Sequence, residues 1–277
     1  MSSIIGSSSQ YHIRSISLPS QFTEVKSPCL SPETVPLNAE ALRNELLHLV
    51  HSVNELLQSL GNQQDLLRHS TLVENTLEDS VILLDLSSRS HELLMTMRQH
   101  VMDIQSAFRR KGRGSNSLEN AIYAYIGFRK KARRESLKCL KALEKMERKL
   151  NHGLLISKET RVLSEVTCLA ISVSQRLFLF LAVGLDSTRG WSFFLSKKKV
   201  YNRRSKNGGD LVMNEIENVD FALDCFCHGR FEDGEGKLMM RLKSLDDGIQ
   251  GLEEGINGFF RCLIRRRVSL LNILTTH

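Results

Sequence analysis

Apolar residues recur every three or four positions along most of this chain, and the clearest run is the last one. Between Ser244 and His277 they are Leu245, Ile249, Leu252, Ile256, Phe259, Leu263, Leu270 and Ile273. This spacing puts them on one face of a helix of about nine turns, interrupted only at Arg266. A helix of this length is not stable alone in water, so other parts of the chain must cover its apolar face.

The same period predicts five helices upstream. They run over residues 37–60, 71–110, 116–150 and 157–184, and from Asp210, as the capping residue, to Phe226. Asn38 and Asn116 are suitable N-caps, and Gly61 ends the first helix. All four prolines fall within the first 36 residues, and proline costs about 3 kcal/mol inside a helix. We therefore predict an all-α fold, a long-helix antiparallel bundle over 37–277, with a disordered Ser/Pro-rich tail over 1–36.

Glycines also recur at helical spacing in the last helix, at Gly248, Gly251, Gly255 and Gly258. Each destabilises a helix by roughly 0.5–1 kcal/mol relative to alanine. A row of them therefore suggests that a neighbouring helix lies against bare backbone. A loosely held helix that frays in its first half is the alternative interpretation.

The net charge of +7 is concentrated in two segments. Ten Lys/Arg and only three Glu lie between Arg129 and Lys149, and seven Lys/Arg with no acid lie between Arg189 and Lys206. The rest of the chain is therefore acidic. Two cationic segments on an acidic body can attract phosphates, anionic lipid headgroups or acidic helices.

Both cationic segments are candidate anionic-surface sites. The first belongs to the predicted helix 116–150, and we place its cations on the outer side of that helix. The second is a predicted loop at about 186–210, in which aromatic and basic residues alternate. The candidates are Arg129, Lys130, Lys131, Arg133, Arg134, Trp191, Lys197, Lys198, Lys199, Arg203 and Arg204. A merely solvated face and a plain connector are the competing interpretations. Nucleic acid is not expected, because the helical segment has no aromatic platform after Phe128.

The most hydrophobic stretch is 157–184, and from Val166 to Leu185 it is long enough to span a bilayer. Arg176 lies at its centre, however, and a central arginine costs about 2.5–3.5 kcal/mol in membrane insertion. We expect a helix buried within the bundle and keep an integral membrane anchor as the alternative.

The tail contains the sequence Arg14-Ser15-Ile16-Ser17-Leu18-Pro19, the R-S-x-S-x-P pattern that 14-3-3 adaptors bind when the second serine is phosphorylated. Phosphate on Ser17 would add nearly two negative charges and strong acceptors for an arginine cluster, and Pro19 would turn the peptide out of the groove. An unmodified serine-rich tail is the simpler interpretation.

The start of the chain also bears on location. Residues Met1 to Phe22 contain no apolar signal-peptide core. The six cysteines of the whole chain are scattered, as is typical of proteins in a reducing compartment. We expect a cytoplasmic protein, with a peripheral membrane location as the alternative. Because no acid occurs before Glu24, an organelle transit peptide stays open.

No motif in the chain predicts catalysis, a metal site or a cofactor. Glu45 and His48 have the spacing of di-metal bundles, but no second Glu-x-x-His occurs. Cys225, Cys227 and His228 also lack the second ligand pair of a zinc site. An enzyme whose site is assembled from distant residues, such as His48, His91, Cys225 and His228, is a hypothesis for the structure to address.

A polar patch at Ser87, Ser88, Ser90 and His91 interrupts the apolar face of the predicted helix 71–110. It predicts a kink, a hydrogen-bonded layer or a binding spot.

Three segments resemble the plant BYPASS-related family. They are Tyr11-His12-Ile13-Arg14-Ser15-Ile16-Ser17-Leu18-Pro19-Ser20, Phe128-Arg129-Lys130-Lys131, and the ending from Gly251-Leu252-Glu253-Glu254-Gly255 through Arg267-Val268-Ser269-Leu270-Leu271-Asn272-Ile273-Leu274. The resemblance implies a helical protein associated with root and shoot development, without catalytic residues. Together with the helical pattern, it favours a non-catalytic scaffold or adaptor that binds protein partners. A peripheral or integral membrane protein, using the basic loop or the 166–185 helix, is the alternative.

Overall fold

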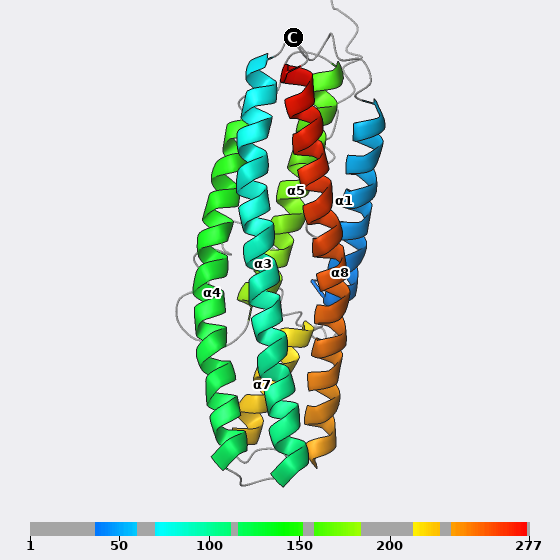
Figure 1. Cartoon of the computed structure of the whole chain (residues 1–277). Helices are drawn as coiled ribbons and strands as arrows, with labels where there is room; N and C mark the ends of the chain where they lie inside the picture. Colours follow the sequence, from blue (N-terminus) through cyan, green and yellow to red (C-terminus); the bar gives the residue numbers. More distant parts are fainter. Residues whose placement is uncertain are drawn as a thin grey trace, which may run out of the picture.

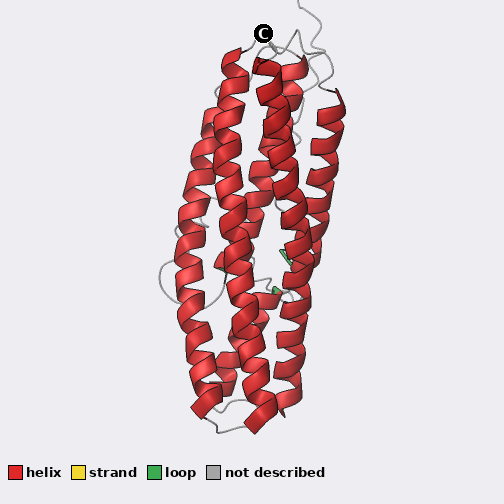
Figure 2. Ribbon diagram, in the orientation of Figure 1, coloured by secondary structure: helices red, strands yellow, loops and turns green. Residues whose placement is uncertain are grey.

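The computed structural model describes residues 37–59, 70–111, 116–151, 158–183, 213–227 and 234–275. Within these ranges nearly every residue is helical and no strand occurs, so the all-α prediction is confirmed (Figure 2). The helices are α1 (Ala39–Ser59), α3 (Ser70–Lys111), α4 (Asn116–Asn151), α5 (Lys158–Ala182), α7 (Glu215–Cys227) and α8 (Gly234–Thr275). The predicted tail over 1–36 and loop over 186–210 lie outside the described residues.

The helices form one elongated bundle (Figure 1). Helices α3, α4 and α8 run nearly its full length, with α5 in its upper part and α7 in its lower part. Helix α3 is antiparallel to α8, because Arg98 pairs with Asp246 at 2.8 Å near one end and Arg267 donates to the Leu77 carbonyl at 2.7 Å near the other. The consecutive helices α3 and α4 are antiparallel as predicted, because Arg89 pairs with Glu135 and Lys149 with Glu78. Helices α4 and α5 are antiparallel too, since Gln175 donates to Glu147 and Arg129 to the Leu181 carbonyl.

The last helix buries the apolar face that its sequence predicts. Every member of that face is at most 3% exposed, namely Leu245, Ile249, Leu252, Ile256, Phe259, Leu263, Leu270 and Ile273. Helices α1, α3 and α7 pack against α8. The stripe is thus the centre of the core, and full burial of each such side chain contributes about 1.5–3 kcal/mol.

The glycines of α8 lie against α1. A Cβ atom added at Gly248 would come within 2.8 Å of Ala39 Cβ, and one at Gly255 within 3.0 Å of Leu46 Cβ. Gly248 lies against Ala39 and Gly255 against Leu46, so residue numbers increase in the same direction along both helices. Helices α1 and α8 are therefore parallel, although the consecutive helices are antiparallel. The predicted close approach of a second helix is confirmed.

Helix α5 is a core helix by its contacts. Among the described helices, only its stretch Leu163–Ala182 is long and apolar enough to cross a membrane, and 67% of its most apolar window is buried inside the bundle. Arg176 Nε donates to Glu45 Oε2 of α1 at 2.8 Å. Burial raises the pKa of Glu45, and the charge of Arg176 opposes this rise.

Two predicted helix starts were displaced. Helix α7 begins at Glu215 rather than after Asp210, because Asn214 is its cap: Asn214 Oδ1 accepts from the Glu217 amide at 2.8 Å, and Glu217 Oε2 accepts from the Asn214 amide at 3.1 Å. This reciprocal pair is a capping box. Helix α8 begins at Gly234, ten residues before the apolar run that predicted it from Ser244. At α1 the predicted cap is confirmed, since Asn38 Oδ1 accepts from the Ala41 amide at 2.8 Å.

Candidate functional site

Arg129 is not part of an anionic-binding surface, so the prediction that it lies on the outer side of its helix was wrong. It is only 1% exposed and is among the largest fully buried side chains of the described residues. Ile122, Tyr125, Arg129 and Ala132 follow one another at steps of three and four on the core side of α4. Arg129 thus occupies a core position of the helix, where a long charged side chain must find partners.

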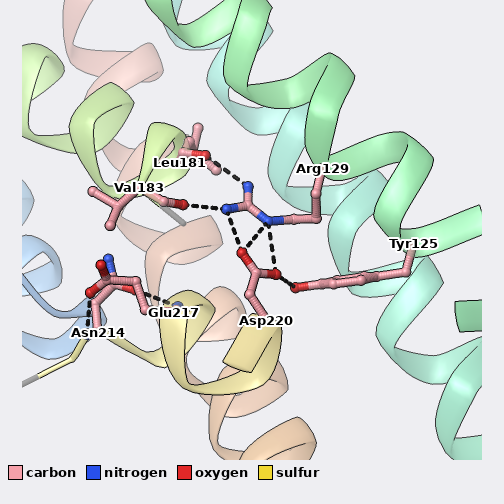
Figure 3. A network of polar contacts seen from close by, with 7 residues as sticks. All are labelled: Tyr125, Arg129, Leu181, Val183, Asn214, Glu217 and Asp220. Carbon is pink, nitrogen blue, oxygen red and sulfur yellow. Dashed lines mark hydrogen bonds and ion pairs between the residues drawn. The ribbon is translucent and has the colours of Figure 1, made fainter. Parts of the chain in front are cut away.

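Arg129 joins α4 to α7 and to the end of α5 (Figure 3). Its Nε donates to both carboxylate oxygens of Asp220, at 3.3 and 3.2 Å, and its Nη2 lies 3.1 Å from Asp220 Oδ2. Its Nη1 donates to the Leu181 carbonyl at 2.8 Å, and its Nη2 also donates to the Val183 carbonyl. Tyr125 OH donates to Asp220 Oδ1 at 2.8 Å. Leu181 lies in the last turn of α5 and Val183 directly follows this helix. Carbonyls at a helix C-terminus need partners from outside the helical ladder.

The charges in this cluster support one another. Burial raises the pKa of Tyr125 well above its ordinary value, and the carboxylate of Asp220 raises it further. The phenol therefore remains a neutral donor. Burial by itself would lower the pKa of Arg129, but the charge of Asp220, the hydrogen bonds to it and the contribution of Tyr125 together more than offset this, and the pKa is raised. The result is a buried ion pair whose remaining hydrogen-bonding capacity is used by Tyr125 and by the end of α5.

Three helix ends meet around this pair. The Arg129 side chain caps α5, the capping box of Asn214 and Glu217 starts α7, and Glu215 reaches the start of α1, where the Ala39 amide donates to its carboxylate oxygens at 3.3 and 3.2 Å. Positive charge at a helix C-terminus and negative charge at an N-terminus are both favourable. We call this cluster the helix junction: Tyr125, Arg129, Asp220, Asn214, Glu215, Glu217 and the carbonyls of Leu181 and Val183.

The helix junction fixes the points where two predicted functional segments join the bundle. The chain preceding Leu37 contains the phosphopeptide motif, and Leu37 stands two residues before the tied amide of Ala39. The basic-aromatic segment connects Val183, whose carbonyl Arg129 holds, with Met213, next to the capping residue Asn214. The junction thus orders the bundle where both segments enter it.

The remaining cations of α4 do form a continuous outer surface. Between Lys130 and Lys149 every exposed charged residue of this helix is cationic, and its three glutamates are only partly exposed. We call this row the cationic ridge: Lys130, Lys131, Arg134, Lys138, Lys141, Lys145, Arg148 and Lys149. At 1.5 Å per residue it is about 30 Å long.

Some members of the ridge already pair with acids of the bundle. Lys138 Nζ lies 2.9 Å from Glu135 Oε1, and Lys149 Nζ lies 3.5 Å from Glu78 Oε2. Arg133, also a predicted surface residue, is half-buried at the edge of the ridge. The other predicted surface residues lie outside the described residues: Trp191, Lys197, Lys198, Lys199, Arg203 and Arg204, together with Arg14, Ser17 and Pro19 of the tail motif.

A second buried cation lies higher in the bundle. Arg266, the break in the apolar stripe of α8, is only 1% exposed. Its guanidinium therefore lies inside the bundle, whereas the charged head of a long arginine side chain usually reaches water. Its Nη2 donates to Thr167 Oγ1 at 2.6 Å and to the Leu163 carbonyl at 3.2 Å, whereas its buried Nε has no partner among the described residues. Burial lowers the pKa of Arg266 to about 10, and the charge of Asp79 opposes this.

The polar patch of α3 is a partly buried layer. Ser90 Oγ donates to the Ser87 carbonyl at 2.8 Å, which is the local bonding expected of a serine inside a helix. Ser87 and Ser90 line a small cavity of about 10 Å³ that they share with Ser174 and apolar residues of α1, α5 and α8. Ser88 is exposed and His91 is half-exposed, 3.9 Å from Glu253.

The residues of the assembled-enzyme hypothesis lie on separate helices. His48 is exposed on α1, His91 lies on α3 and Cys225 on α7, and no described hydrogen bond or ion pair joins one to another; His228 is outside the described residues. Within the described part of the chain, no group of three or more His, Cys, Asp or Glu is placed to hold a metal ion. The five cysteines that are described are free thiols.

Comparison with known proteins identifies the family. No curated protein and no solved structure matches the chain. A scan of protein families finds the family described as Protein BPS1, whose match covers residues 44–273 and thus α3, α4, α5, α7, most of α1 and nearly all of α8. This agrees with the resemblance to BYPASS-related proteins, and the chain belongs to the BPS1 family.

Proposed function

We propose that this protein is a non-catalytic helical scaffold or adaptor that binds acidic protein partners along the cationic ridge of α4. The observation that carries the proposal is the ridge itself, eight exposed cations with no exposed acid between them on one straight helix. Such a surface attracts an acidic partner over its full length and speeds their encounter. The resemblance to BYPASS-related proteins supports a role in plant root and shoot development.

A direct binding experiment tests the ridge. The base-reversed variant carries Arg134→Glu, Lys141→Glu and Arg148→Glu, and a matched control carries three equal changes of charge away from the ridge, Lys237→Glu, Lys243→Glu and Arg261→Glu. The probe is a labelled peptide of repeated glutamate, followed by fluorescence anisotropy in dilute salt. We expect native protein and control to bind it, and the base-reversed variant to lose at least about tenfold in affinity. Equal affinities for all three proteins would overturn the role of the ridge.

Affinity capture from plant seedlings extends the test to natural partners. Proteins that the native chain and the control retain, and that the base-reversed variant loses, support the scaffold function. A protein set that is identical for all three baits counts against it.

Regulation through the tail is the second part of the proposal. Phosphate on Ser17 would complete the motif of Arg14 and Pro19 for a 14-3-3 adaptor. Capture with a Ser17→Ala variant, beside a Ser15→Ala control, tests this part. The adaptor should be lost with Ser17→Ala or after phosphatase treatment and kept with Ser15→Ala. Retention after either treatment would contradict phosphate recognition at Ser17.

An anionic membrane surface is the second candidate partner, because a straight cationic row about 30 Å long can lie flat on lipid headgroups. Co-sedimentation with vesicles that contain phosphatidylserine, compared with neutral vesicles, tests it. Loss of binding in the base-reversed variant would support contact through α4. Loss after changing Lys197, Lys198 and Lys199 to Ala would support contact through the segment 186–210. Equal sedimentation with both kinds of vesicle would overturn both contacts.

A further inference from the structure

The outer side of α3 carries exposed acids beside the cationic ridge. Glu78, Asp85 and Glu92 are all exposed and follow one another at intervals of seven residues. Seven residues are close to two helical turns, so the three carboxylates lie in one row along the helix. We call this row the acidic ridge. Arg89, the exposed cation beside it, is drawn toward Glu135 of α4 at 3.8 Å.

The two ridges belong to neighbouring antiparallel helices, which lie side by side in Figure 1. Contacts between them fix which residues share a height in the bundle: Arg89 meets Glu135, Lys149 meets Glu78, and the rings of His100 and Phe128 are 5.1 Å apart. A step of one residue toward the C-terminus of α3 therefore matches, in height along the bundle, a step of one residue toward the N-terminus of α4.

This register places acids and cations at equal heights. Glu78 lies at the height of Arg148, Asp85 at that of Lys141, and Glu92 at that of Arg134. The three cations are themselves spaced by seven residues and are all exposed. A second set at the same interval, Lys131, Lys138 and Lys145, lies within about one turn of these heights.

A rotation of 180° about an axis parallel to the bundle keeps every height unchanged. When the axis runs just outside the α3–α4 face, the rotation places α3 of one copy opposite α4 of the other copy, and α4 opposite α3. Each acid of the acidic ridge then faces a cation of the other copy, and the pattern occurs twice. We propose that a second copy of this chain binds through the α3–α4 face as a twofold dimer, held by complementary acidic and cationic ridges. This inference rests on the proposed function, because it names one partner of the same cationic ridge.

Exposed ion pairs are individually weak and are screened by salt, so the dimer should be a salt-sensitive one. The test uses sedimentation velocity of the full-length protein from about 1 µM to about 100 µM, in about 0.05 M and about 0.5 M NaCl. We expect dimers in dilute salt that dissociate in the higher salt. Native protein that stays monomeric throughout, or a dimer that salt does not affect, would overturn the proposal.

Charge reversal supplies a sharper arm of the test. The acid-reversed variant carries Glu78→Lys, Asp85→Lys and Glu92→Lys, and its partner is the base-reversed variant described above. Each variant alone presents like charges across the twofold axis and should lose at least about tenfold in self-affinity. Mixed in equal amounts, the two variants should form a heterodimer, because at the three matched heights one carries cations on both helices and the other carries acids on both. Failure of the mixture to associate would contradict pairing of the two ridges.

Controls separate this inference from the proposed function. A variant with three exposed acids reversed elsewhere, Glu40→Lys, Glu55→Lys and Asp247→Lys, should dimerise like the native protein; loss of its dimer would refute the assigned face. Circular dichroism confirms that every variant is folded. A native protein that is monomeric but still binds the glutamate peptide refutes the dimer and leaves the scaffold function standing. A dimer that forms as expected without any peptide binding supports the dimer and counts against acidic partners of the ridge other than a second copy.

Discussion

At the scale of single residues, the stability of the bundle should depend strongly on the buried pair of Arg129 and Asp220. Both side chains are at most 5% exposed. Removing one partner of such a pair leaves a buried charge without compensation. We expect Asp220→Ala to lower the free energy of unfolding by about 3–5 kcal/mol, measured by urea unfolding followed by circular dichroism.

The matched control removes both charges, with Arg129→Met and Asp220→Leu. It should recover part of the loss, yet stay less stable than the native protein, because the carbonyls of Leu181 and Val183 lose their donor. A single variant within about 1 kcal/mol of the native protein would show that the pair does not hold the junction together.

Asp79 provides a residue-scale prediction about pH. It is 3% exposed on α3 and faces Lys149, Glu78 and Arg266. Burial raises its pKa above the ordinary value, and the attraction of Lys149 offsets this only in part. Between the pKa of the unfolded chain, about 3.9, and the raised value, the folded state binds more protons than the unfolded state. The free energy of unfolding contributed by this group therefore falls as the pH rises through that window.

The variant Asp79→Asn cannot ionise, so its stability relative to the native protein should increase as the pH rises above about 4. Urea unfolding at a series of pH values measures the difference, with Glu74→Gln, exposed on the same helix and outside the acidic ridge, as control. The attraction of Arg266 and Lys149 acts only on the ionised carboxylate and is already included in the net rise of the Asp79 pKa. Only the exchange of a neutral carboxyl for an amide adds an offset that does not vary with pH. A difference that stays flat, or that falls with rising pH, would refute the raised pKa.

At the scale of elements, the contact between α1 and α8 depends on bare backbone. Alanine is favoured over glycine in a helix by roughly 0.5–1 kcal/mol, but a Cβ at Gly248 or Gly255 would approach α1 side chains to 2.8 or 3.0 Å. Overpacking of this kind typically costs about 1–3 kcal/mol. We expect the double variant Gly248→Ala and Gly255→Ala to lose stability and to lose hydrogen-exchange protection in α1.

The control for this prediction is Gly127→Ala in α4, where an added Cβ meets nothing within 4 Å. That variant should become more stable by about 0.5–1 kcal/mol, because only the helix preference of alanine acts there. Equal gains in both variants would show that α1 does not press on the glycines of α8.

The helices and their positions were the features that the sequence predicted best. Helical period, capping residues and glycines are local signals, and they located the six helices of the described residues and the close contact of α8 with another helix. The start of α7 was missed because Asp210 was preferred over Asn214, although only Asn214 has a glutamate three residues later to complete a capping box.

At the scale of the whole molecule, prediction stopped where long-range pairing begins. Arg129 was assigned to the surface because it is charged, although its spacing from Ile122 and Tyr125 put it on the core side. What decides its position is Asp220, which lies 91 residues away in the chain, and a local pattern contains no information on that partner. The parallel course of α1 and α8, and the matched ridges of α3 and α4, are likewise products of packing between distant segments.

The last prediction concerns helix α5, whose length and composition would suit a membrane. Its contacts with the described helices lie within the bundle: it packs against α4, α1 and α3, Arg176 pairs with Glu45 of α1, and Arg266 of α8 holds its Leu163 carbonyl. Insertion into lipid would break these bonds and uncover the core stripe of α8. We therefore expect an alkaline carbonate wash of plant membranes to release all of the full-length protein, with an integral membrane protein as control. Retention in the washed membrane would mean that α5 leaves the bundle, which its ion pair to α1 opposes.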